Sequence, residues 1–241
     1  MSVTRKQYFT RLFGRIVILI VCFIMCFKPQ FYNILEGMHF FDRFHVLHLL
    51  WLIWIFDMIQ QIIPIKNKLA LGSQKLFANR FKPIREKINY NALKNYIKNT
   101  TALAYKVFII WALLVAFIGV LYYSNIINKT WLFMFSVFFY VCDLICVLIW
   151  CPFRLIMKNK CCTTCRIFNW DHLMMFSPLI FCGGFFAISL VVMAFLAWLI
   201  WELCILLYPE RFFEMTNVAL RCSNCTDKLC TQYCKKLRSK R

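Results

Sequence analysis

The chain has 241 residues, of which 62% are hydrophobic, and its formal net charge is +19. This apolar share is well above the roughly 45–50% of a soluble domain, which excludes a water-soluble fold. A strongly basic soluble protein would suggest a nucleic acid as its partner. Here the basic residues cluster between long apolar runs, so we expect anionic lipid headgroups as partners and no nucleic acid.

Apolar stretches long enough to enter a membrane recur along residues 1–208, and the sequence therefore predicts an all-α, polytopic transmembrane bundle of five or six spans. The predicted spans cover about residues 12–34, 44–65, 104–127, 131–151 and 173–208. The first span lacks a signal-peptide cleavage site, because Lys28, Pro29 and Gln30 follow it. We expect the amino terminus in the cytoplasm of a bacterial cell, with the spans in the inner membrane.

The longest polar stretch is 66–103, which holds nine basic residues and one acid, Glu86. Its apolar residues recur at roughly helical spacing, interrupted by Pro83. This pattern predicts one or two basic amphipathic helices on the cytoplasmic leaflet. Recruitment of an acidic protein partner at the cytoplasmic face is the alternative interpretation.

The last apolar run, 173–208, contains a single charged residue, Glu202. As one helix it would be about 54 Å long, which exceeds a membrane core of about 30 Å yet barely suffices for two crossings. Either one long tilted helix leaves the tail 209–241 outside, or a break at Gly183-Gly184 or near Ser189 returns the tail inside. The basic tail favours the second topology, whereas the weak turn signal favours the first.

Seven of the fourteen cysteines lie in two polar segments, a loop and the tail. They are Cys161, Cys162 and Cys165 in the loop and Cys222, Cys225, Cys230 and Cys234 in the tail. Two Cys-x2-Cys pairs brought together supply four thiolates, the ligand set of structural zinc. We therefore expect the loop and tail to hold a zinc ion jointly and so to dock a partner. An iron–sulfur cluster is the weaker match, because the spacing differs from the ferredoxin run.

A membrane thiol–disulfide redox protein is the first alternative function. In an oxidising compartment the four tail cysteines could pair as two disulfides, and either Cys-x2-Cys pair could exchange with a substrate disulfide. No thioredoxin-like strand and helix pattern surrounds either pair. The cysteines inside the predicted spans read instead as small packing residues; they are Cys22, Cys26, Cys142, Cys146, Cys182 and Cys204.

A small cation or proton transporter is the second alternative, because Asp57, Asp143 and Glu202 sit on three different predicted spans. An ionisable group in a span is costly and normally faces protein or water. The three acids could form a proton or cation path, although hydrogen bonding between helices would also account for them. No internal repeat supports a transporter, and the absence of known catalytic motifs leaves enzymatic activity open.

Overall fold

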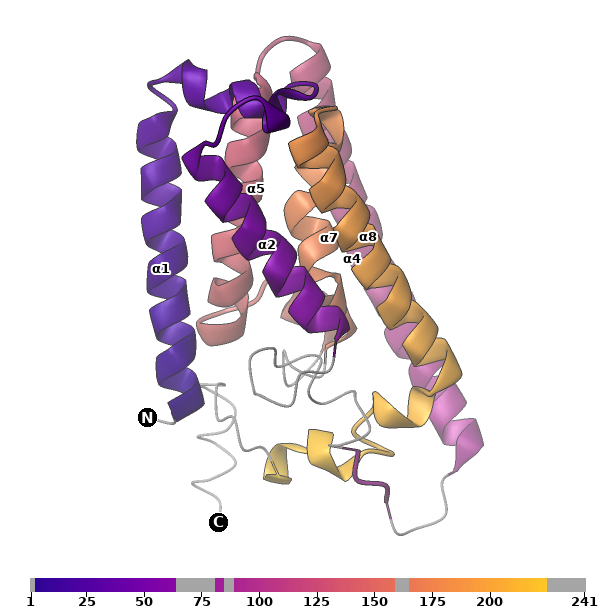
Figure 1. The fold of residues 1–241 in the computed structure, drawn as a ribbon. Coiled ribbons are helices and arrows are strands. Elements are labelled where there is room, and N and C mark those ends of the chain that lie inside the picture. Colours follow the sequence, from indigo (N-terminus) through magenta and orange to yellow (C-terminus); the bar gives the residue numbers. More distant parts are fainter. Residues whose placement is uncertain (1–2, 64–80, 85–88, 159–164, 225–241) are drawn as a thin grey trace.

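The computed structural model describes residues 3–63, 81–84, 89–158 and 165–224, which form an all-helical bundle (Figure 1). The predicted all-α class is therefore confirmed for this part of the chain. Four of the described helices are long and apolar enough to cross a membrane. They are α1 (Val3–Met25), α4 (Tyr90–Tyr123), α5 (Lys129–Leu148) and α8 (Phe185–Leu207), while α2 (Val46–Ile62) is apolar but shorter.

Short helices connect these long ones. Between α1 and α2 lie η1 (Pro29–Leu35) and η2 (His39–Phe41), and α6 (Phe153–Met157) follows α5. Three short helices run in succession toward α8, namely η5 (Arg166–Trp170), α7 (Asp171–Phe176) and η6 (Ser177–Phe181). After α8 come η7 (Pro209–Arg211), η8 (Val218–Leu220) and η9 (Cys222–Asn224). Figure 1 shows η1 and η2 at one end of the bundle, and η7 to η9 at the other, where α1 begins.

Local side chains set several helix boundaries. Asn89 caps α4 by accepting a hydrogen bond from the Ala92 backbone N–H at 3.1 Å. Asn128 does the same for α5 through the Trp131 N–H at 3.2 Å. Asparagine is a favoured amino-terminal cap because its side-chain oxygen satisfies one of the free N–H groups of the first turn.

Two predicted span boundaries differ from the structure. The helix α1 ends at Met25 rather than near residue 34, because Pro29 lacks the N–H that a continuing helix needs and begins η1 instead. The helix α4 starts at Tyr90 rather than 104, so residues 90–103 extend a long helix instead of forming a separate surface helix. Leu93 of this extension is buried against the end of α8 and the start of the tail. Residues 64–80 and 85–88 of the predicted amphipathic segment lie outside the described residues.

The apolar run 173–208 is interrupted at Gly183 and Gly184, so it is not one uninterrupted helix. Gly183 has a φ of +71°, a conformation that residues with a side chain rarely adopt. A Cβ atom on Gly184 would lie 2.2 Å from the carbonyl oxygen of Leu35, and the Phe185 N–H donates to the Gly37 carbonyl at 2.9 Å. The turn thus packs directly against the connection between η1 and η2.

The centre of the bundle is aromatic. Trp54 of α2 is fully buried and packs against rings from three other helices; these rings are Phe133, Tyr140, Phe176 and Phe186. The buried face of α8 carries small residues, among them Ala187, Ala194 and Ala197. Small residues let helices approach closely in a membrane, where packing rather than water exclusion drives association.

Large apolar side chains are also exposed on the outer faces of the long helices. Phe13 of α1 is 69% exposed and Leu113 of α4 is 66% exposed. Such a continuous apolar exterior is unusual for a soluble monomer and suits helices that contact lipid.

Candidate functional site

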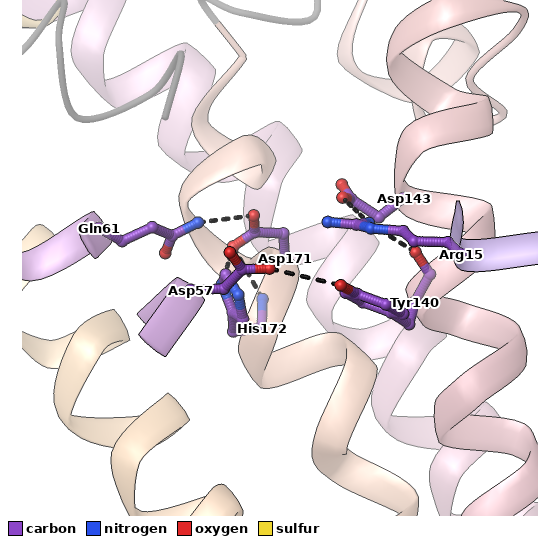
Figure 2. A network of polar contacts seen from close by, with 7 residues as sticks. All are labelled: Arg15, Asp57, Gln61, Tyr140, Asp143, Asp171 and His172. Carbon is purple, nitrogen blue, oxygen red and sulfur yellow. Dashed lines mark hydrogen bonds and ion pairs between the residues drawn. The ribbon is translucent and has the colours of Figure 1, made fainter. Parts of the chain in front are cut away.

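A buried polar cluster lies inside the bundle and is drawn in Figure 2. Its seven side chains come from four helices; they are Arg15 of α1, Asp57 and Gln61 of α2, Tyr140 and Asp143 of α5, and Asp171 and His172 of α7. Arg15 lies about 15 Å from the Met25 end of α1, and Asp57 about 16 Å from the Val46 end of α2, at about 1.5 Å per residue. Both residues therefore lie well inside their helices, away from the ends that adjoin η1 and η2.

Arg15 and Asp143 form an ion pair with an Nη1 to Oδ2 distance of 2.8 Å. The same nitrogen donates to the Tyr140 carbonyl oxygen at 2.6 Å, and the guanidinium lies 3.8 Å from the centre of the Tyr140 ring. The side chains of Arg15 and Asp143 are 11% and 14% exposed. Such a pair is expensive to desolvate and holds together only when further hydrogen bonds surround it, as they do here.

The other half of the cluster joins α2 to α7. Gln61 donates to the Oδ2 atom of Asp171 at 2.8 Å. Asp171 Oδ1 accepts from the His172 backbone N–H at 2.8 Å and lies 3.1 Å from His172 Nδ1. Tyr140 links the halves, since its hydroxyl donates to Asp57 Oδ2 at 3.4 Å.

One ring nitrogen of the cluster has no hydrogen-bond partner among the described residues. Nε2 of His172 is buried, although Nδ1 of the same ring contacts Asp171. His172 is 5% exposed and lies within electrostatic range of Asp57 and Asp143. A buried polar atom without a partner costs about 1–3 kcal/mol, so this nitrogen is a favourable place for a proton or a water molecule.

The cluster carries an excess of acidic groups. Among the seven residues drawn in Figure 2, Asp57, Asp143 and Asp171 accompany one permanent cation, Arg15, and a second arginine, Arg154, lines the adjoining cavity. Uncompensated charge in a low-dielectric interior is unfavourable, so carboxylates beyond the first require protons, a protonated histidine or a bound cation. The arrangement can therefore take up and release positive charge.

Glu202 belongs to a different site, which alters the predicted path through the three acids. It forms an ion pair with Arg166 and accepts a hydrogen bond from Trp170 Nε1 at 2.7 Å. Both side chains of the ion pair are largely buried. Asp57 and Asp143 are brought into one cluster, whereas Glu202 is neutralised by an arginine of its own.

A cavity of about 250 Å³ adjoins the cluster. Asp143, Asp171 and Arg154 line it, together with apolar residues of α4, α5, α6, η5 and α7. Cys142 and Cys146, which the sequence suggested as packing residues, line this cavity too. The cluster thus has one face on a space that could admit water or a small ion.

Most of the predicted zinc ligands lie outside the described residues. These are Cys161, Cys162, Cys225, Cys230 and Cys234, and for Cys222 the structure describes only its place in η9. Cys165 is half-buried beside the cavity. Within the described ranges no three His, Cys, Asp or Glu side chains converge as a metal site, so zinc has no support there.

The start of the tail is nevertheless fixed to the end of the bundle where α4 begins. Val218 N–H donates to the Lys82 carbonyl at 2.9 Å, and Pro83 pairs with Asn217 in an antiparallel bridge. The Asn217 side chain is fully buried and bonds the Lys82 N–H and the Arg211 carbonyl.

Five members of the cluster were not among the predicted path residues: Arg15, Gln61, Tyr140, Asp171 and His172. Arg15 looked like part of a basic, cytoplasmic amino terminus, and the polar segment up to residue 172 looked like a loop. Two signals pointed to them. Gln61 lies one helical turn after Asp57, and Arg15 is followed at once by the apolar run of α1.

Comparison of the chain with models of protein families, with curated proteins and with solved structures finds no match. The geometry of the cluster and cavity is therefore the basis for the function.

Proposed function

We propose that the chain is an integral membrane protein that translocates protons through the buried cluster. The observation that carries this proposal is the unpartnered Nε2 of His172, buried in a cluster with more carboxylates than cations. Ionisable groups that face the interior of a membrane bundle typically mark proton or ion pathways. Histidine is suited to the task because its ordinary pKa lies near physiological pH.

Each side chain has a distinct role in this mechanism. Asp171 accepts a hydrogen bond from the Nδ1–H of His172, and this tautomer leaves the lone pair of Nε2 ready to take up a proton. Asp57 lies within electrostatic range of His172 and receives or supplies the proton. Arg15 pairs with Asp143, and Asp143 lies within electrostatic range of the positive charge that forms on the histidine.

We further infer six crossings, with the amino terminus and the tail on the cytoplasmic side of a bacterial inner membrane. Residues 166–181 run antiparallel to α8, because Arg166 meets Glu202 near one end of that helix and Gly184 meets Leu35 at the other. Their α and 3₁₀ turns would span about 29 Å if straight, close to one membrane core. The basic residues of the tail and of 66–103 then lie on the same, cytoplasmic side of the membrane, as the positive-inside rule expects.

Proton flux in liposomes tests the proposal. The purified protein is reconstituted with an internal pH-sensitive dye, and a potassium gradient with valinomycin drives proton entry. We expect the full-length protein to acidify the lumen faster than protein-free liposomes. The variant Asp57→Asn should fall to the protein-free rate, because an amide cannot carry the proton.

The matched control is Asp42→Asn, which changes an exposed aspartate near η2. It should leave the flux unchanged, while size-exclusion profiles in detergent verify that both variants fold. Equal flux in the Asp57→Asn variant and the unaltered protein would contradict the proposal, as would unaltered protein that conducts no protons.

A joint zinc site of the 161–165 loop and the tail is the second candidate function, with a role in docking a partner. It is favoured by Tyr96 of α4, which lies within electrostatic range of both Cys165 and Glu214 of the tail. Metal analysis of the purified protein with and without Cys162→Ser and Cys225→Ser is the test. One zinc per chain that is lost in both variants is expected, and a metal-free protein would remove this candidate.

Labelling of intact cells with an impermeant thiol reagent tests the thiol–disulfide alternative, which requires an external tail.

A further inference from the structure

The cavity beside the cluster is rich in sulfur. Four cysteines and two methionines line it, namely Cys142, Cys146, Cys151, Cys165, Met174 and Met175. They come from α5, from the turn that follows it and from the segment leading into and through α7. Sequence spacing does not reveal this gathering, because Cys142 and Cys165 are separated by α6 and the loop after it.

Two of these thiols already contact each other. Cys146 lies in the last turns of α5 and Cys151 just after the helix, and their side chains are hydrogen-bonded. Cys142 lies one helical turn before Cys146 on the same face of α5. The cavity therefore contains a hydrogen-bonded pair of thiols, with a third sulfur one helical turn earlier on α5.

Charged groups complete the lining. The acids Asp143 and Asp171 line the same cavity, as does one arginine, Arg154. The two carboxylates attract a cation that enters, and Arg154 offsets part of that attraction. The volume of about 250 Å³ is also below the roughly 300–1,000 Å³ of typical organic-ligand pockets, which favours a small ion.

We propose that the cavity binds a soft, monovalent metal cation of the Cu(I) or Ag(I) type through the thiols of Cys146 and Cys151. Thiolate and thioether ligands select soft cations, and a soft monovalent ion is satisfied by two sulfur ligands. Zinc in a structural site needs four ligands, and no three candidate ligands converge within the described residues. The proposal deepens the proposed function, on which it rests, by naming a cation whose binding releases protons to the cluster.

The proton balance links the two sites. Binding of one monovalent cation to two thiols forms two metal–sulfur bonds, breaks two S–H bonds and releases two protons. The oxidation state of the metal does not change. Asp143 and Asp171 line the same cavity and are the nearest acidic groups to receive these protons. The cluster would then pass them on through His172.

The test measures metal binding at equilibrium, apart from any flux. The probe is Cu(I) held by a colorimetric Cu(I) chelator under anaerobic, reducing conditions. The full-length chain carries serine at its loop and tail cysteines so that only the remaining thiols compete; the replaced residues are Cys161, Cys162, Cys222, Cys225, Cys230 and Cys234. We expect this chain to remove one equivalent of Cu(I) from the chelator.

Further substitutions in that chain locate the metal. Cys146→Ala and Cys151→Ala should each abolish the binding of one equivalent of Cu(I). Cys22 and Cys182 lie outside the cavity lining, so Cys22→Ala and Cys182→Ala should still bind it. As a second readout, one equivalent of Ag(I) should protect Cys146 and Cys151 from alkylation, mapped by mass spectrometry. Unchanged binding in Cys146→Ala, or protection of other cysteines instead, would overturn the proposal.

The outcome is separable from that of the proposed function. Asp57→Asn should retain the Cu(I) equivalent while it loses proton flux. A protein that conducts protons but binds no Cu(I) at these thiols would refute only the metal inference, and a protein that binds Cu(I) without proton flux would refute only the proton pathway.

Discussion

Arg15 and Asp143 lie 2.8 Å apart in the middle of the bundle, although 128 positions separate them in the sequence. The pair joins α1 to α5, and both side chains are largely buried. Removal of one partner leaves a buried, uncompensated charge, which typically costs about 3–5 kcal/mol.

The Asp143→Asn variant should therefore lose about 3–5 kcal/mol of unfolding free energy, measured by thermal or denaturant unfolding in detergent. The double variant Arg15→Gln with Asp143→Asn should recover most of the loss, because neither charge is then left alone. The matched control is the exposed pair of Lys129 and Glu36, at 3.1 Å. Loss of that pair through Glu36→Gln should cost only about 0–1 kcal/mol. A double variant as unstable as Asp143→Asn would contradict this account of the pair.

The ion pair of Glu202 and Arg166 is expected to act in stability and not in proton transfer. Glu202→Gln should lower the unfolding temperature, because Arg166 and the Trp170 N–H lose a charged acceptor. The same variant should keep the proton flux of the unaltered protein, in contrast to Asp57→Asn. A loss of flux in well-folded Glu202→Gln protein would restore Glu202 to the proton path.

The turn at Gly184 should not tolerate a side chain. An added Cβ would lie 2.2 Å from the Leu35 carbonyl oxygen, so Gly184→Ala should destabilise the protein by about 1–3 kcal/mol. Gly14 in α1 is the control, since a Cβ there meets nothing within 4 Å. Gly14→Ala should be neutral or stabilising by about 0.5–1 kcal/mol, as expected in a helix interior. Unfolding curves of equal midpoint for the two variants would show that the turn is not packed as described.

The tail should detach when Asn217 is replaced. Asn217→Ala removes the side chain that bonds the Lys82 N–H, the Arg211 carbonyl and the Ala219 N–H. The unsatisfied backbone groups should lower the free energy of local unfolding of 209–224 by about 1–3 kcal/mol. Limited proteolysis within 209–224 should therefore become faster. The exposed Asn224, which bonds only the Val218 carbonyl at 3.0 Å, is the control. Identical cleavage rates for Asn217→Ala and Asn224→Ala would contradict the role given to Asn217.

Hydropathy was sufficient to predict the helical class and the approximate place of each long helix, because burial in lipid demands continuous apolar runs. It offered Gly183-Gly184 as one of two places for a break in the run 173–208, and the structure has its break there. It did not place the end of α1, because the predicted first span continued through Pro29 to about residue 34.

The site was predictable only in part. Asp57 and Asp143 stood out because charge is rare in an apolar run, and the structure places both in one cluster. Asp171 and His172 did not, because the segment before α7 is polar and the sequence gives no sign that it folds back into the bundle. The ion pair of Glu202 was not foreseen for the same reason, since its counter-ion Arg166 lies in that segment.

The most direct test of the account is proton flux through the His172→Gln variant in liposomes under an imposed potential. Glutamine can retain a hydrogen bond to Asp171 but cannot carry a proton between neighbours. We predict a folded variant that moves protons no faster than protein-free liposomes, while the unaltered protein acidifies the lumen. Flux equal to that of the unaltered protein would contradict the claim that the buried cluster is a proton pathway.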